Sequence, residues 1–387
     1  MKSLNWRRLI SGCSFFHGCR VAHADLRVRA GISFFIVFGW LVASAQAAEV
    51  DASQPPDFET FESLQDLFKA EVPKVFGASR REEESTRAPA AVTVVKADEI
   101  NKFGYRTWAD LLMSVRGLHV SYDRNYSLLG VRGFNRGDYN SRVLVLIDGH
   151  RINNNLTDGA PIGTDFPLGI DLVEQVEIIR GPSAVLYGNN AFFGVINVVT
   201  RKGHLMEGHG TEVSGEVATF DTYKGRVTYG KQFTNGLEIM LSGSLYDSEG
   251  HDHLFYKEFN SPTSNNGIAQ DADRDNFKSL FSTVSYKDFS LQGAFITREK
   301  HNPTALYGTA FKNPRFRTVD DRSYVNLTYK HEAPDIIDVD AKLSYDRYEL
   351  TRDQPIDPTL PLTTDKQAGE WWGAELQLNK TLWKNCV

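Results

Sequence analysis

The C-terminal half of the chain alternates apolar and polar residues with a period of two, and this pattern constrains the fold most. From Ile337 to Asp346 every odd position is apolar and every even position is polar. Such alternation is typical of β-strands with one apolar face, and it does not fit membrane-spanning helices. We expect strands near residues 210–220, 222–233, 236–247, 276–287, 288–299, 321–332, 336–350 and 369–382.

The connections between these strands are of two kinds. Asp221 and Thr234–Gly236 are tight, whereas residues 248–275, 300–320 and 352–367 are long. Short inner turns and longer outer loops are typical of a transmembrane β-barrel. We therefore interpret residues 204–387 as the N-terminal portion of an outer-membrane barrel. A soluble β-sandwich, which also alternates, stays open as an alternative.

The first 47 residues read as a targeting segment. Basic residues precede an uncharged apolar run from Gly31 to Ala45, and the small residues Ala45-Gln46-Ala47 close it. This order predicts a signal peptide over residues 1–47 and a mature chain from Ala48, although the run is also just long enough for an uncleaved anchor. Removal of this basic segment makes the net charge more negative than −6, which disfavours nucleic acid as a partner. Cys386 is then the only cysteine left.

Residues 48–87 are polar and too short for a further folded domain. We expect a flexible periplasmic arm. Within it, Val72, Val75 and Phe76 form a short extended patch that the sheet edge of a partner could capture by strand addition. A linker with incidental apolar residues is an equal alternative.

Residues 88–203 alternate strand and helix and predict a small α+β domain. Thr107 should cap a helix that Gly117 ends, with Asp110 in its first turn. The continuous apolar run Val143–Ile147 indicates a strand buried on both faces. Further strands are expected at residues 91–95, 118–122, 128–131, 173–179 and 195–200.

A domain of this size needs a wide barrel around it. An eight-stranded barrel is filled by its own side chains, whereas about 22 strands enclose a lumen that holds a folded plug. The final residues, Trp383–Val387, also lack the terminal aromatic residue expected of an outer-membrane barrel. We therefore expect an incomplete barrel, with about 8 of about 22 strands, in a chain truncated at its C-terminus.

Several motifs in residues 88–203 share the order and spacing of one family. They are Pro89–Val95, Val131–Phe134, Leu146–Gly149, Val176–Gly188 and the run from Asn189 to Arg201. They resemble the plug domain of TonB-dependent outer-membrane receptors, most closely the cobalamin, colicin and catecholate-siderophore group. The resemblance implies an outer-membrane receptor in a bacterium. It would take up a scarce nutrient, an iron-siderophore or cobalamin-type chelate, using force from a TonB-like energy-coupling protein.

Charged residues of a plug must be paired or hydrated inside a barrel. The family resemblance implies that Arg132 and Arg180 latch the plug to glutamates on the barrel wall. We expect ligand contacts from the outward plug loops, where Tyr126, Arg136, Tyr139 and Asn154 offer stacking surfaces and hydrogen bonds. Ordinary solvated loop positions are the alternative for each. These loops span residues 122–128, 135–140 and 153–165.

Other chemical signatures are weak. Gly181-Pro182-Ser183 lacks the second glycine of a nucleophile elbow. His251 and His253 could form a metal-binding pair in an outer loop, but we favour solvated loop residues. The aspartates 271, 273 and 275 form a candidate calcium cluster with the same alternative. We expect no enzyme, no cofactor and no resident metal. Two further functions stay open: a passive channel or adhesion barrel constricted by its N-terminal domain, and a non-functional truncated receptor fragment.

Overall fold

The structure is a computed structural model. It describes residues 74–75, 83–84, 90–135, 137–206, 210–333, 337–356 and 361–380. Among these residues, no helix is long and apolar enough to cross a membrane.

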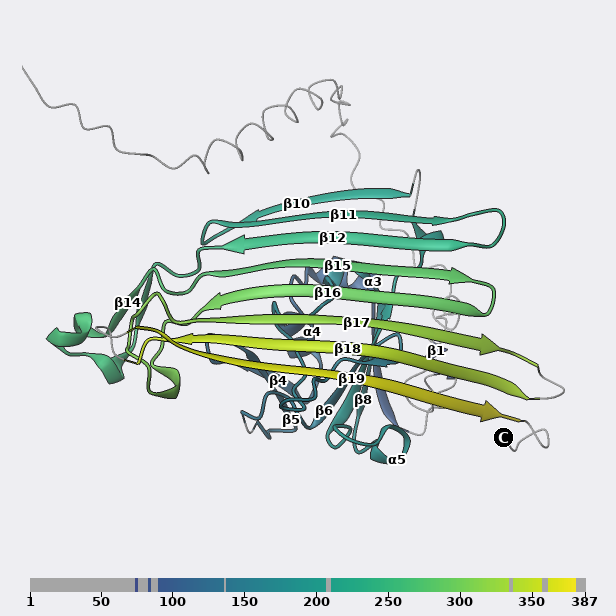
Figure 1. Cartoon of the computed structure of the whole chain (residues 1–387), viewed down its shortest axis with the longest axis horizontal. Coiled ribbons are helices and arrows are strands. Elements are labelled where there is room, and N and C mark those ends of the chain that lie inside the picture. Colours follow the sequence, from purple (N-terminus) through teal and green to yellow (C-terminus); the bar gives the residue numbers. More distant parts are fainter. Residues whose placement is uncertain are drawn as a thin grey trace, which may run out of the picture. The chain divides into compact units, whose positions relative to one another are not determined.

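In the described part of the C-terminal half, eight long strands form one antiparallel sheet in chain order, and two short strands within a connecting loop pair separately. Figure 1 shows them as long, neighbouring arrows. The prediction of eight strands is confirmed, and the sequential pairing of one sheet differs from the two packed sheets of a sandwich. The strands are β10 (Thr211–Ala218), β11 (Thr222–Gln232), β12 (Glu238–Ser248), β15 (Asp275–Tyr286), β16 (Phe289–His301), β17 (Arg317–His331), β18 (Asp338–Gln354) and β19 (Thr363–Asn379).

The two faces of this sheet have opposite chemistry. Apolar side chains such as Leu280, Phe295 and Val325 are exposed on the outer face. Polar side chains such as Gln292 and Asn326 are buried on the inner face. Because an aqueous protein buries its apolar residues, this inverted arrangement is typical of a barrel wall that meets lipid outside and a polar interior.

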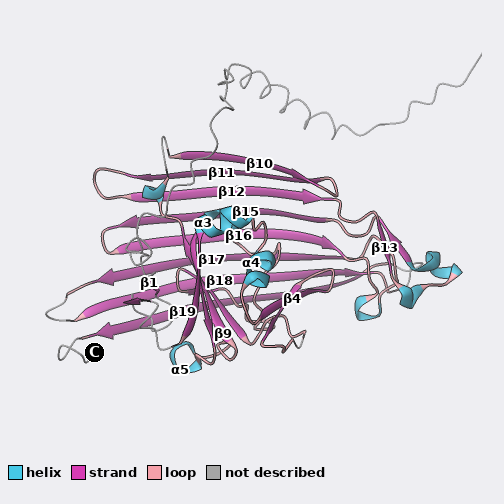
Figure 2. Ribbon diagram, turned by 180° about the vertical axis from the view of Figure 1, so that it is seen from behind, coloured by secondary structure: helices cyan, strands magenta, loops and turns pink. Residues whose placement is uncertain are grey.

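The connections sort by end of the sheet, with one correction to the sequence prediction. The long loops after β12, β16 and β18 lie at one end, here called the outer end, where β13 (His253–Phe255) and β14 (Ile268–Gln270) also lie (Figures 1 and 2). The tight turn around Asp221 was expected at the inner end. It lies at the outer end, where the Glu249 N–H donates a hydrogen bond to the Phe220 carbonyl over 3.1 Å. Because successive strands run in opposite directions, the order of the strands decides at which end of the sheet each turn lies. The length of the turn does not.

The plug domain lies against the inner face of this sheet (Figure 2). Its central sheet has the order β3-β8-β9-β6-β7, with β6 and β9 parallel and the other pairs antiparallel. A separate hairpin pairs β4 with β5, and a two-residue pair joins β1 (Lys74–Val75) to β2 (Glu83–Glu84). The elements are β3 (Ala91–Lys96), α3 (Ala97–Phe103), α4 (Trp108–Ser114), β4 (Leu118–Tyr122), β5 (Ser127–Val131), β6 (Val143–Ile147), β7 (His150–Arg151), β8 (Val173–Arg180), α5 (Ala184–Tyr187) and β9 (Gly194–Thr200).

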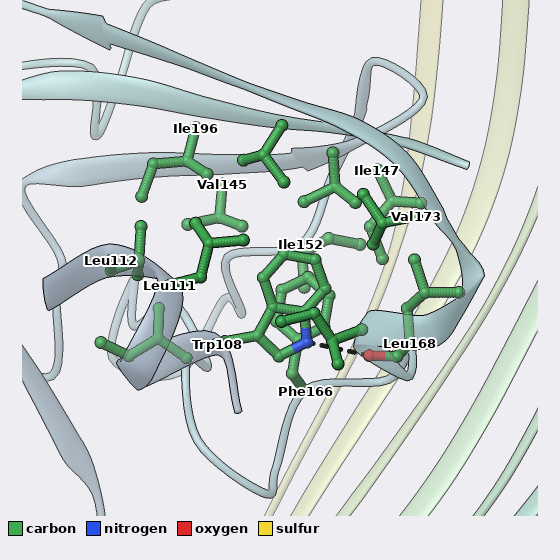
Figure 3. Close-up of a cluster of buried hydrophobic side chains, with 14 of the residues drawn as sticks. Trp108, Leu111, Leu112, Val145, Ile147, Ile152, Phe166, Leu168, Val173 and Ile196 are labelled. Carbon is green, nitrogen blue, oxygen red and sulfur yellow. Dashed lines mark hydrogen bonds between the residues drawn. The ribbon is translucent and has the colours of Figure 1, made fainter. Parts of the chain in front are cut away.

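Helix α4 anchors the plug core. The Thr107 hydroxyl accepts a hydrogen bond from the Asp110 N–H, and the Asp110 carboxylate accepts one from the Thr107 N–H, so the predicted cap is a full capping box. The helix ends at Ser114, before Gly117. Its Trp108 indole N–H donates to the Leu168 carbonyl over 2.9 Å, and the ring packs on Phe166 (Figure 3). This core therefore holds the irregular segment around residue 168 in place.

Candidate functional site

A cavity of about 200 Å³ lies between the outward loops of the plug and the barrel wall. Tyr126, Tyr139 and Asn154, three residues singled out from the sequence, all line it. Arg136, the fourth, lies outside the described residues. The wall and its outer loops contribute Tyr307, Asp320, Arg322, Tyr348, Leu350, Arg352 and Gln367. The structure thus brings plug residues and wall residues together at the outer end of the sheet.

Tyrosines dominate the surface of this outer cavity. The Tyr126 hydroxyl donates to Asp320 Oδ1 over 2.9 Å, and the Tyr348 hydroxyl donates to the same oxygen over 2.7 Å. The hydroxyl oxygens of Tyr139 and Tyr307 lie 2.6 Å apart. Burial raises the pKa of Tyr126 well above its usual range, and the nearby Asp320 carboxylate adds to this effect. Both effects favour the protonated hydroxyl, which donates to Asp320.

Charged groups of both signs border the same cavity. The Arg352 guanidinium lies 4.5 Å from the centre of the Tyr307 ring, and Arg322 Nη2 donates to Asp346 Oδ1 over 2.7 Å. Burial raises the pKa of the Asp165 carboxyl, and Arg298 opposes that effect only in part. Aromatic faces, hydroxyl groups and paired charges of this kind suit a bulky polar ligand.

Asn154 has a structural role in addition to its place in the cavity. Its side-chain oxygen accepts hydrogen bonds from the Leu156 and Thr157 N–H groups over 3.0 and 2.9 Å, and its amide group donates to the Gly159 carbonyl over 3.2 Å. These bonds fix the loop of residues 154–159. Asn154 shapes the wall of the cavity, since its oxygen is already engaged.

The two arginines expected to latch the plug lie in other surroundings. Arg132 is exposed, and Arg180 Nη1 donates to the Arg116 carbonyl over 3.1 Å. Among the described residues, no ion pair joins either arginine to a glutamate of the barrel wall, so the latch stays a prediction.

The described contacts between plug and wall use other residues. Plug His150 Nε2 lies 3.0 Å from Asp346 Oδ1 of β18, and Gln292 Nε2 of β16 donates to plug Asp148 Oδ2 over 2.6 Å. Arg298 of β16 donates to the plug Asn125 carbonyl over 2.7 Å. Sequence reasoning did not single out these residues. The sequence did carry a signal for the wall residues, because each of them occupies a polar, inward-facing position in the alternating pattern of its strand.

Two other sequence hypotheses fall on paired or buried residues. Asp273 Oδ1 lies 2.7 Å from Lys300 Nζ, and Asp275 Oδ1 lies 3.1 Å from Arg298 Nε, so two of the three aspartates of the candidate calcium cluster are paired with the protein's own cations. No set of side chains suited to a metal ion occurs in the described part of the chain. Val75, a candidate for partner contact, is only 1% exposed and packs with Leu144 and Val195. Val72 and Phe76 lie outside the described residues.

Comparison with known proteins identifies the plug. Residues 84–195 match the family described as the TonB-dependent receptor plug domain. The vitamin B12 transporter of Vibrio vulnificus (strain CMCP6) is 34% identical over 187 residues, which make up 46% of this chain and 28% of that protein. The chain therefore matches well under a third of the length of this curated relative.

Two solved structures share the fold. The ferric yersiniabactin uptake receptor of Yersinia pestis superposes with a TM-score of 0.53 at 19% identity, covering 75% of this chain and 45% of that one. A ferric enterobactin receptor of Pseudomonas aeruginosa gives a TM-score of 0.56 at 18% identity, covering 79% and 48%. These relatives are receptors and transporters of the bacterial outer membrane, the localisation predicted for this chain. Residues 84–195 thus match the TonB-dependent receptor plug domain, and the chain shares with these solved structures the fold of such a domain followed by an antiparallel sheet.

Proposed function

We propose that the chain is part of an outer-membrane receptor that takes up a scarce nutrient actively, with force from a TonB-like energy-coupling protein. The nutrient we propose is an iron-siderophore or a cobalamin-type chelate. In this proposal residues 1–47 are the signal peptide, residues 48–87 a periplasmic arm, residues 88–203 the plug and residues 204–387 barrel wall. The similarity to a vitamin B12 transporter and to ferric-chelate receptors supports this ligand class.

The single observation that carries the proposal is the outer cavity. It combines plug residues with wall residues at the end of the sheet where the long loops lie. A plug that fills the lumen blocks free diffusion, so a ligand held above it can pass only if the plug moves. The outer membrane holds no ATP, and the arm of residues 48–87 is the segment through which a partner could apply force.

The test uses a receptor-deficient bacterial strain that carries the gene. Uptake of radiolabelled cyanocobalamin and of a panel of ferric siderophores is measured with and without residues 49–86. We expect binding of one of these chelates to survive the deletion while its uptake stops. Uptake that continues without the arm would favour a passive channel and would contradict the proposal.

A second comparison tests the cavity itself. Replacement of Tyr139 by alanine removes a ring that lines the cavity, and we expect weaker binding of the transported chelate. Tyr286→Ala is the matched control, because Tyr286 is an exposed residue at the inner end of β15 and does not line the cavity. Equal binding by both variants would place the ligand elsewhere.

A further inference from the structure

A buried lysine at the outer end of β16 binds one aspartate of the long loop that precedes β15. Lys300 is only 1% exposed. Its Nζ donates to the Asp273 carbonyl over 2.6 Å and to Asp273 Oδ1 over 2.7 Å. The ammonium group thus engages both the backbone and the side chain of one residue. A buried charge is costly unless it is paired and hydrogen-bonded, so movement of Asp273 away from Lys300 is strongly disfavoured.

The second carboxylate oxygen of Asp273 faces two other parts of the chain. The His251 N–H, from the start of the same loop, donates to Asp273 Oδ2 over 3.3 Å. Arg124 Nη1, from the plug, lies 3.5 Å from the same oxygen. The barrel wall, the long outer loop and the plug therefore meet at a single carboxylate, which we name the Asp273 junction.

The backbone at the base of this outer loop, residues 249–274, packs closely on the junction. Gly250 has a φ of +73°, and a Cβ atom there would lie 2.2 Å from the Asp273 carbonyl oxygen. Glycine is therefore required at this position. The Asp271 N–H donates to the Asp252 carbonyl over 3.0 Å, and the β13–β14 hairpin begins directly beyond this bond. The base of the loop is thus closed over the carbonyl that Lys300 holds.

Arg124 links the junction to the plug side of the outer cavity. It lies in the turn between β4 and β5 with a φ of +74°, a left-handed conformation that is uncommon for a residue with a side chain. In the same turn, Asp123 Oδ1 accepts hydrogen bonds from the N–H groups of Asn125 and Tyr126 over 2.8 and 2.6 Å. Tyr126 lines the outer cavity. The contact between Arg124 and Asp273 therefore restrains the turn that carries Tyr126.

Three aromatic rings link the same outer loop to the wall side of the cavity. The rings of Phe259 and Phe311 stack with their centroids 4.2 Å apart, and Tyr256 meets Phe311 edge-on at 5.7 Å. Phe311 belongs to the second outer loop, residues 302–316, which also carries Tyr307. Tyr307 lines the outer cavity. Because stacked rings favour a defined geometry, the position of the first loop influences that of the second.

We propose that Lys300 is a positioning residue for the outer cavity. Its ammonium group holds Asp273, and through this junction it sets the positions of Tyr126 and Tyr307. The alternative is an ion pair that stabilises the end of β16 and leaves the loops unaffected. The purpose of the junction rests on the proposed uptake function. Its test uses neither a ligand nor an energy-coupling partner, so failure of the junction and failure of the uptake function are seen separately.

The test compares a neutral and a charged side chain at the position of Lys300 in the same polypeptide. Cys386→Ser removes the remaining cysteine of the mature chain, and Lys300→Cys removes the ammonium group. Aminoethylation of the unfolded chain with bromoethylamine converts the new cysteine into a close isostere of lysine. Both forms and the parent are refolded from urea into detergent. A lysine-specific protease then reports on the two outer loops, because Lys257 lies in the first and Lys312 in the second.

We expect nicking after Lys257 and after Lys312 to be at least about tenfold faster in the neutral form, because loss of one partner of a buried ion pair favours local opening. Aminoethylation should return both rates close to those of the parent. Lys278→Cys, studied in the same two forms, is the matched control. Lys278 lies on the neighbouring strand β15 and is exposed on the outer face, so its two forms should be nicked at the same rate.

Arg124→Gln tests the plug side of the junction in a chain that keeps Lys300, so this measurement does not depend on the refolding of the neutral form. We expect faster hydrogen exchange in the turn of residues 123–126, measured by mass spectrometry, because the turn loses its contact with Asp273. The neutral form at Lys300 should show the same change in this turn.

Three results would each overturn the proposal. The first is equal nicking of the neutral and aminoethylated forms at Lys300. The second is faster nicking after Lys257 without faster nicking after Lys312. The third is unchanged hydrogen exchange of the plug turn in Arg124→Gln.

Discussion

The plug and the barrel wall use the same residue types with opposite orientation. In the plug, Ile147 is 0% exposed at the centre of the sheet, whereas Leu280 of the wall is 49% exposed on its outer face. In the wall it is the charged side chain of Arg298 that is 2% exposed. Alternation alone therefore defines two faces of a strand, and the medium on each side decides which face is apolar.

The largest expected effect lies in the plug core. Trp108→Ala should lower the free energy of unfolding of the plug by roughly 3–5 kcal/mol, because it removes a large buried ring and leaves a cavity. The measurement is the urea concentration at which the plug of the full chain becomes protease-sensitive in detergent. Trp372→Ala is the control on the wall, where the ring is 71% exposed, and we expect the plug transition to stay unchanged. Equal shifts would break the comparison between the two regions.

The next effect tests the outer face of the wall. Leu280→Arg places a charge where lipid is expected, and we predict a loss of roughly 2–4 kcal/mol in stability in phospholipid vesicles. Lys278→Arg is the matched control, because Lys278 lies two residues away on the same face and is already charged and exposed. The free energy of folding into vesicles is measured by denaturant titration. Similar stability of the two variants would mean that this face does not meet lipid.

The smallest effect tests the inner face. Gln292 donates to plug Asp148 and accepts a hydrogen bond from the Tyr324 hydroxyl over 3.0 Å. Gln292→Leu should destabilise the chain by roughly 1–3 kcal/mol although leucine is more apolar, because it leaves buried polar partners unpaired. Leu291→Ala, on the opposite face of the same strand, should change the plug transition less. If Gln292→Leu stabilised the chain, our assignment of this side of β16 as the inner, plug-facing side would be wrong.

Much of the fold could be predicted from local sequence. The strands of the wall were found because their alternation is long and regular, and the start of α4 was found because Thr107 and Asp110 form a capping box. The short elements α5 and β7 were not predicted, since two to four residues carry too little periodicity. The predicted inner position of the Asp221 turn was wrong, because the prediction used loop length in place of strand direction.

The site could be predicted only in part. Tyr126 and Tyr139 were found because aromatic residues in outward loops are easily recognised, and both border the outer cavity. The sequence did not single out Asp320, Arg322 and Arg298. A polar residue at every second position of a strand is also typical of a strand face exposed to water. Only the packing of the plug against that face shows that these charges are buried. Contacts between residues more than a hundred positions apart carry no local signal.

The plug meets the wall through apolar side chains such as Phe281 and Met240, which belong to the plug's buried cluster, and also through groups that water could satisfy. His150, Gln292 and Arg298 each hold a polar atom across this boundary. When such a contact breaks, a water molecule can take the place of the lost partner at little cost, whereas a broken apolar contact exposes surface that water solvates poorly. The polar part of this boundary should therefore open at a lower cost in free energy than the apolar part around Phe281.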